Sequence, residues 1–403
     1  MNTRSERNTA LLLAATQALY QTASVVMVAV GGLVGLQLAP DARLATLPIG
    51  MVMVAATATM IPASLFMQRY GRRAGFLLGS ALGASAGVLA TLGVLMESFA
   101  MFIAANALLG MYGAFAGYYR FAAADAVNPS FRGPALSWVV AGGIVAALLG
   151  PAIVRHSDNL AHIGASPFIA PYVAMTLLGL LAIVLVSRLN VPPMLPPTTS
   201  ENNEARPLAE IMRQPAFITA LAGTTVGFAV MVMVMTATPL AMKLCGLPLQ
   251  ASTTVIQWHM LGMFVPAFFT GKLIQRVGVL PVMASGVALL LAHVCVVLSG
   301  IAYGNFIAGL IMLGMGWNFL YVGGSTLLTE CYRPAERSRT QAAHDFIVYG
   351  ITSVASLSAG GLLAVLGWQA VNIAVIPALL VVGIAIANLT WKRRPMLATI
   401  KQG

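Results

Sequence analysis

Long uncharged stretches of apolar residues recur along the whole chain, and short polar segments separate them. Each stretch has about 20 residues or more, the length that an α-helix needs to cross the hydrocarbon core of a bilayer. The pattern predicts an all-α polytopic membrane protein with twelve transmembrane helices. The predicted helices lie at residues 9–38, 44–67, 74–95, 98–119, 134–154, 167–187, 217–242, 249–271, 279–299, 302–328, 343–366 and 368–391.

A polar, proline-rich segment lies in the middle of the chain, at residues 188–216, and has the composition of a loop. It divides an N-terminal six-helix half, residues 1–187, from a C-terminal six-helix half, residues 217–403. The halves share two loop motifs, which predicts pseudo-symmetric halves with a binding site at their interface. Gln68-Arg69-Tyr70-Gly71 matches Gln275-Arg276-Val277-Gly278, and Asp125-x-x-x-Pro129-x-x-Arg132 matches Glu330-x-x-x-Pro334-x-x-Arg337.

The composition and the charge distribution support this topology. Apolar residues make up 59% of the chain and charged residues only 8%, against about 25% charged in soluble domains. Of the 22 Lys and Arg residues, all but Arg43, Arg155 and Lys243 fall on the side that also holds both termini. By the positive-inside rule we expect both termini in the cytoplasm. The excess of basic residues therefore reflects topology in a lipid bilayer, and we expect no nucleic-acid partner.

Two pairs of potential metal ligands lie in adjacent predicted helices. Met231 and Met235 are four residues apart, as are His259 and Met263, and residues four apart share a face of an α-helix. Thioether and imidazole groups without a carboxylate suit Cu(I). Methionine also fills gaps in packed helices, and a buried histidine can be a hydrogen-bonded packing residue, so both interpretations stay open.

The twelve helices, the cytoplasmic termini, the central loop and both loop motifs resemble those of the major facilitator superfamily. In that family the loop after the second helix usually reads G-x-x-x-D-R-x-G-R-R, whereas here Ser64 and Gln68 replace the glycine and the aspartate. The resemblance implies that charged residues at the helix ends stabilise one conformation of the carrier. Without the usual aspartate, we expect Asp125 and Glu330 to be the charged partners of the gating arginines Arg69, Arg132, Arg276 and Arg337.

Within the superfamily, the M-x-x-x-M and H-x-x-x-M pairs look like those of the CcoA-type copper importers. This resemblance implies that Met231, Met235, His259 and Met263 bind copper as a transported substrate, with no prosthetic group. It further implies import across the bacterial inner membrane by alternating access, in support of haem–copper oxidase and other cuproenzyme biogenesis. We expect a monomer, by analogy with the superfamily. The chain contains no nucleophile–base set and no phosphate-binding loop, so we do not expect an enzyme.

The alternative cargo is an organic solute such as riboflavin, because some relatives of these importers are described as riboflavin transporters. Polar and aromatic residues in the first, fourth and tenth helices would then bind it, unless they only form hydrogen bonds between helices. No Asp or Glu lies in the middle of a predicted helix, so any proton coupling would depend on His259 or on His344-Asp345. The polar candidates are Gln17, Tyr20, Gln21, Asn106, Tyr112, Asn318 and Tyr321.

Overall fold

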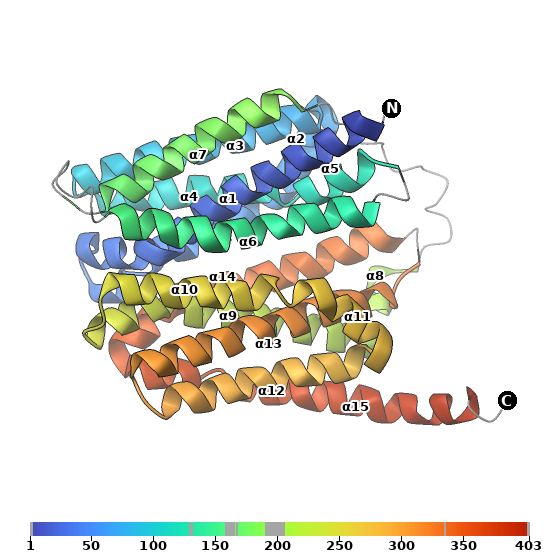
Figure 1. Ribbon diagram of the computed structural model, residues 1–403. Coiled ribbons are helices and arrows are strands. Elements are labelled where there is room, and N and C mark those ends of the chain that lie inside the picture. Colours follow the sequence, from blue (N-terminus) through green and yellow to red (C-terminus); the bar gives the residue numbers. More distant parts are fainter. Residues whose placement is uncertain are drawn as a thin grey trace.

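The computed structural model describes residues 3–128, 132–157, 166, 168–189, 206–333 and 336–400, and helices account for most of them. Both termini lie at the same end of the molecule (Figure 1). The helices, in chain order, are α1 (Thr3–Leu38), the short 3-10 turn η1 (Ala42–Leu44), α2 (Leu47–Tyr70), α3 (Arg72–Leu95), α4 (Phe99–Ala116), α5 (Tyr119–Asp125), α6 (Arg132–Ser157), α7 (Ile169–Ser187), α8 (Leu208–Met212), α9 (Pro215–Leu244), α10 (Leu249–Phe264), α11 (Ala267–Val277), α12 (Val279–Leu298), α13 (Tyr303–Thr329), α14 (Arg337–Ile373) and α15 (Ile376–Ile400).

These helices make twelve membrane crossings, so the predicted fold class is confirmed. Ten helical stretches in the described part of the chain are long and apolar enough to cross a membrane. The stretch Arg339–Arg393 holds two crossings, because Gly367 has a φ of +79° and interrupts the helix there. The remaining crossing is shared by α10 and α11, which Pro266 separates. Proline removes a backbone donor and its ring clashes with the preceding turn, so the helix breaks at this point.

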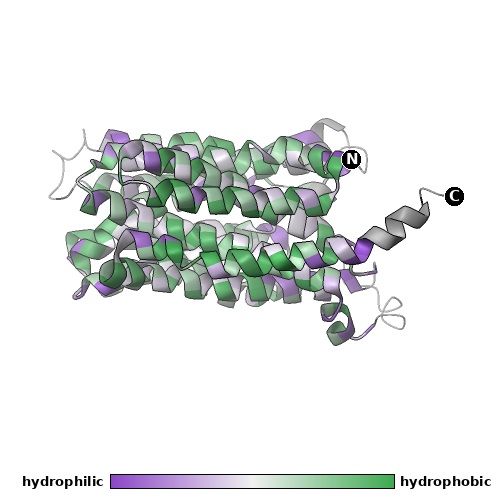
Figure 2. Cartoon of the chain, turned by 90° about the horizontal axis from the view of Figure 1, so that it is seen from below, coloured by the Kyte–Doolittle hydropathy of each residue, from purple (hydrophilic) through white to green (hydrophobic). Residues whose placement is uncertain are grey.

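The helices form two bundles that lie side by side. Helices α1 to α7 form the blue-to-green bundle in Figure 1, and α9 to α15 form the yellow-to-red one. Hydrophilic residues gather at the two ends of the molecule, whereas apolar residues cover most of its length (Figure 2). Residues 190–205 lie outside the described residues, so the limits of the two halves and of the central loop stay a prediction.

The repeated loop motif has the same backbone conformation in both bundles. Gly71, between α2 and α3, has φ +87° and ψ 156°, and Gly278, between α11 and α12, has φ +91° and ψ 161°. A side chain at either position would be strained, because L residues rarely adopt a positive φ. The glycine in each motif therefore lets two consecutive helices reverse direction over a single residue.

The contacts that join the bundles are concentrated at the end of the molecule away from the termini. There, α2 packs against α14, α6 against α10, and the end of α1 against the end of α9. The Thr46 hydroxyl accepts a hydrogen bond from the Gly360 backbone N–H at 2.9 Å, and Gly50 lies directly against Leu357. At the same end, Arg155 donates to the side chain of Gln257 at 2.9 Å. The bundles are thus closed against each other at this end.

We expect Gly110→Ala to destabilise the N-terminal bundle by about 1–3 kcal/mol, the usual cost of overpacking a core. Gly110 of α4 lies so close to α2 that an added Cβ would clash with the carbonyl oxygen of Val52, which is backbone and cannot move aside. Thermal unfolding of purified protein in detergent measures this effect. Gly350→Ala is the matched control, because a Cβ there meets no atom within 4 Å and alanine favours a helix. Equal melting temperatures for the two variants would contradict the close approach of α2 and α4.

Candidate functional site

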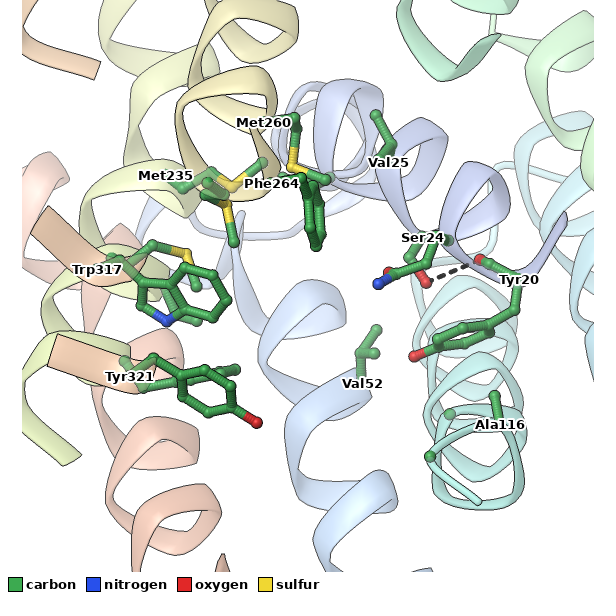
Figure 3. A pocket seen from close by; sticks show the side chains of 18 of the residues that line it. Tyr20, Ser24, Val25, Val52, Ala116, Met235, Met260, Phe264, Trp317 and Tyr321 are labelled. Atoms are coloured by element: carbon green, nitrogen blue, oxygen red, sulfur yellow. Dashed lines mark hydrogen bonds between the residues drawn. The ribbon is translucent and has the colours of Figure 1, made fainter. Parts of the chain in front are cut away.

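A cavity of about 650 Å³ lies between the two bundles (Figure 3). Side chains of α1, α2, α4, α5, α6, α9, α10, α11, α13 and α14 line it. Its wall runs from Met27 and Ile49, beside the closed end, to Gly117, Arg120 and Phe268. Gly117 and Phe268 are exposed, so the cavity leads toward the end of the molecule that carries the termini. Closure at one end and access from the other is the arrangement of an alternating-access carrier.

Three of the four predicted copper ligands line this cavity. Met231 and Met235 of α9 and Met263 of α10 all belong to its wall and are more than 90% buried. Met260, which the sequence analysis did not single out, joins them on the cavity wall from α10 (Figure 3). These methionines therefore lie on the side of the C-terminal bundle that faces the other bundle, and their role as copper ligands stays a prediction.

His259, the fourth predicted ligand, is not among the residues that line the cavity. It is fully buried where α10 packs on α13, and its Nδ1–H donates a hydrogen bond to the Leu310 carbonyl at 2.8 Å. The helices approach closely there, because a Cβ at Gly314 would lie 2.5 Å from the His259 carbonyl oxygen. The Nε2 atom is left as an acceptor with no hydrogen-bond partner among the described residues. The histidine thus has a packing role in this conformation, and its role as a copper ligand stays a prediction.

An aromatic wall lies beside the thioethers. The rings of Trp317 and Tyr321 are stacked, with centroids 4.9 Å apart and an interplanar angle of 10°. Phe228 of α9 packs against both rings, with centroids 5.7 Å and 5.9 Å away, and against Tyr349 of α14 at 5.6 Å. All four residues line the cavity. Flat aromatic faces of this kind suit a planar aromatic solute, which gains both buried apolar area and stacking.

Five of the seven predicted polar candidates also line the cavity, namely Gln17, Tyr20, Gln21, Asn318 and Tyr321. The Gln17 side-chain oxygen is buried without a hydrogen-bond partner among the described residues. Asn106 and Tyr112 lie behind the wall instead: the Asn106 amide donates to the Phe102 carbonyl of its own helix, and Tyr112 packs edge-on against Tyr20. Whether a polar residue lines the cavity or lies behind its wall depends on how its helix is rotated in the bundle. The spacing of residues in the sequence does not give this rotation.

Sequence reasoning missed several residues of the cavity. Arg120 stands one residue after the predicted helix 98–119, where a basic residue usually marks the cytoplasmic flank of a membrane helix. In the structure α4 ends at Ala116, and the short helix α5 places Arg120 on the cavity wall. Trp317 carried a usable signal, because it lies four residues before Tyr321 and thus on the same helix face.

The predicted gating charges find partners other than those expected. Asp125 accepts a hydrogen bond from Arg72 at 2.7 Å, and Glu330 accepts one from Arg393 at 2.8 Å. In this conformation neither acid forms an ion pair with Arg69, Arg276 or Arg337 among the described residues, and the expected gating role of these charges stays a prediction. Arg69 and Arg276 are the next-to-last residues of their helices, and both are exposed, as is Arg337. The Arg69 guanidinium lies over the Tyr70 ring, 5.3 Å from its centroid. The side chain of Arg132 lies outside the described residues.

A carboxylate that the sequence analysis did not single out forms the most extensive of these charge contacts. Glu336 is fully buried and accepts hydrogen bonds from the backbone N–H and the guanidinium of Arg206 and from the backbone N–H of Arg333. Hydrogen bonds from Arg206, and then from the Arg333 backbone, hold the pKa of the Glu336 carboxyl well below its usual range. Because Arg206 also donates to the Cys331 carbonyl, the end of the central segment is tied to the loop between α13 and α14.

These features define a class of protein: a membrane carrier in which two helical bundles enclose a central cavity. The sequence profile of the Major Facilitator Superfamily matches residues 11–257 and 249–402. The chain therefore belongs to the major facilitator superfamily. This family and the transporter names of the relatives point to a carrier and not to an enzyme.

Among its relatives is a protein from Brucella anthropi named "Riboflavin transporter RfnT". It is 37% identical over 393 residues, which cover 98% of this chain and 97% of that protein. A Bacillus subtilis protein, "Uncharacterized MFS-type transporter YdeG", is 30% identical over 80% of this chain and 77% of its own length. The crystal structure of the nucleoside transporter NupG has the same fold, with a TM-score of 0.68 over 97% of this chain and 99% of that chain at 14% identity.

We expect Asp125→Asn to destabilise the protein more than Glu330→Gln. The Arg72 side chain is only 6% exposed, so losing Asp125 leaves a buried charge unpaired, at a cost of about 1–3 kcal/mol. Glu330 and Arg393 are 44% and 34% exposed, and a pair of this kind contributes about 1 kcal/mol or less. Melting temperatures of the two variants in detergent measure the difference. A larger loss for Glu330→Gln would contradict the pairing of Asp125 with Arg72.

Proposed function

We propose that this chain is a riboflavin carrier. The observation that carries the proposal is the stacked Trp317–Tyr321 wall of the cavity, which offers a flat face to the isoalloxazine ring of a flavin. The cavity volume of about 650 Å³ falls within the range of about 300–1,000 Å³ typical of small-molecule sites. The relative named a riboflavin transporter, which matches nearly the whole length of the chain, supports the same cargo.

Polar groups around the aromatic wall suit the rest of a flavin. Gln17 and Gln21 of α1 lie on the cavity wall contributed by the other bundle, and the Gln17 oxygen has no partner among the described residues. Asn318 stands next to Trp317 and is held in place, because its amide donates to the Met263 carbonyl at 2.8 Å. A ribityl chain carries several hydroxyls that both donate and accept hydrogen bonds, so amide side chains match it well.

The location and direction of transport belong to the same proposal. The basic residues on the side of the termini support a bacterial inner-membrane carrier with both termini in the cytoplasm. With that orientation the cavity of this structure leads to the cytoplasm, and import would end with release from this state. We further propose that the carrier works as a monomer without a prosthetic group.

Copper remains a second candidate cargo, favoured by one observation. The thioethers of Met231, Met235, Met260 and Met263 all line the same cavity, and thioether sulfur is a soft ligand that suits Cu(I). Against it stands the position of His259 behind the cavity wall, which leaves the wall without the imidazole of the predicted set.

Cells that neither make riboflavin nor take it up are expected to accumulate riboflavin when they express this protein. Trp317→Ala should lower the initial uptake rate by about tenfold at matched membrane levels, because it removes one face of the stack; this corresponds to about 1.4 kcal/mol. Trp317→Phe should keep most of the activity. Trp258→Ala is the matched control, since Trp258 is 48% exposed and does not line the cavity. Uptake no higher than in cells with the empty vector would contradict the proposal.

The same cells test copper directly. If copper is a cargo, uptake of copper exceeds the vector control and falls strongly in Met235→Ala, while Met233→Ala has little effect. Met233 is the control because it is buried in the packing core of the C-terminal bundle and does not line the cavity. Riboflavin uptake without any copper uptake would exclude copper as the cargo.

A further inference from the structure

Arg120 is the sole charged side chain among the described residues that line the cavity. It is the second residue of α5, just after α4 ends, and it lies on the cavity wall between the two bundles. Ionisable side chains within the membrane region are costly, so they usually mark the path or the site of a transported solute. The position of Arg120 therefore indicates that its guanidinium binds a group of the transported solute.

The guanidinium of Arg120 has at least one N–H donor that no described residue uses. No carboxylate among the described residues forms an ion pair with it, and its Nε atom is buried without a hydrogen-bond partner. Asp345 of α14 lies within electrostatic reach, but its carboxylate accepts a hydrogen bond from the His344 Nδ1–H at 3.0 Å. The Arg120 Cζ atom lies 4.7 Å from the ring centroid of Phe121, a cation–π contact that does not satisfy the N–H groups.

Arg120 is close to the aromatic wall. Tyr321 and Tyr349 of the other bundle lie within electrostatic reach of Arg120, and the Tyr321 hydroxyl is near enough to form a side-chain hydrogen bond with it. Tyr321 is also the outer ring of the stack with Trp317, and its hydroxyl points into the cavity in Figure 3. A planar solute that lies along this stack would thus present one edge to the guanidinium.

We propose that Arg120 determines specificity by binding the pyrimidinedione edge of a flavin ring. The proposal rests on the riboflavin function proposed above. Each carbonyl oxygen of that edge accepts hydrogen bonds while the N3–H between them donates, so the planar fork of the arginine, which only donates, would bind at one of the two carbonyl oxygens. A single cation facing an otherwise uncharged wall suits a neutral acceptor edge better than a doubly charged phosphate, so riboflavin is favoured over its phosphate ester.

Titration of the purified protein in lipid nanodiscs with riboflavin, followed by quenching of flavin fluorescence, tests this inference. Arg120→Gln is expected to raise the Kd by about 10- to 100-fold, because it removes charge-assisted hydrogen bonds. Arg120→Lys keeps the charge but loses the planar fork, so we expect a smaller increase. Lys272→Gln is the matched control: it removes one positive charge from an exposed position on α11 outside the cavity.

Changing the ligand instead of the protein distinguishes a loss of flavin recognition from a general effect of the Arg120 substitution on folding. In 2-thioriboflavin and 4-thioriboflavin, sulfur, a weaker acceptor, replaces one oxygen of the dione edge. The wild-type protein should bind riboflavin more tightly than at least one of these analogues, and Arg120→Gln should lose that preference. An unchanged preference in Arg120→Gln, or an unchanged riboflavin Kd, would overturn the role of Arg120 while leaving the riboflavin carrier intact. A wild-type protein that binds no riboflavin would instead overturn the proposed function itself.

Discussion

The close packing of α2 against α14 at one end of the molecule is the contact on which the cavity depends. Gly50 has no side chain to hold the helices apart, and the Thr46 hydroxyl accepts a hydrogen bond from the Gly360 backbone N–H, so the two bundles pack tightly there. From that end the bundles separate and leave about 650 Å³ between them. The contacts that close one end of a carrier must break when the carrier changes conformation. A few glycine contacts and hydrogen bonds can break in this way without exposing a large apolar core.

The chemistry of the cavity follows from how charge is distributed in the fold. Acidic and basic side chains form their pairs at the helix ends, as Asp125 does with Arg72, which leaves the cavity wall apolar, aromatic and thioether-rich. Arg120 is the exception. In a wall with no described carboxylate, it favours a solute that brings its own acceptors and little net charge. This combination fits a flavin better than a cationic drug, and it gives a bare metal ion only neutral ligands and one repelling cation.

Much of this arrangement could be predicted from the sequence, because it rests on local patterns. Hydropathy gave the twelve crossings, and the i, i+4 spacing put Met231 and Met235 on one cavity-facing surface. His259 lies on a predicted helix as expected, but it packs against α13 at Gly314. Which face of α10 turns toward α13 depends on this contact between segments that are distant in the sequence. Arg120 was missed because α4 ends earlier than predicted, at Ala116. In the sequence Arg120 resembles a basic residue that follows a membrane helix, whereas in the structure it lies on the cavity wall.

A structure of the protein determined with saturating riboflavin is the most direct test of the proposed flavin site. We expect flavin density inside the cavity, with the ring against Trp317 and Tyr321 and its dione edge within hydrogen-bond distance of Arg120. An empty cavity at saturating riboflavin, or a flavin bound only on the outer surface, would contradict it.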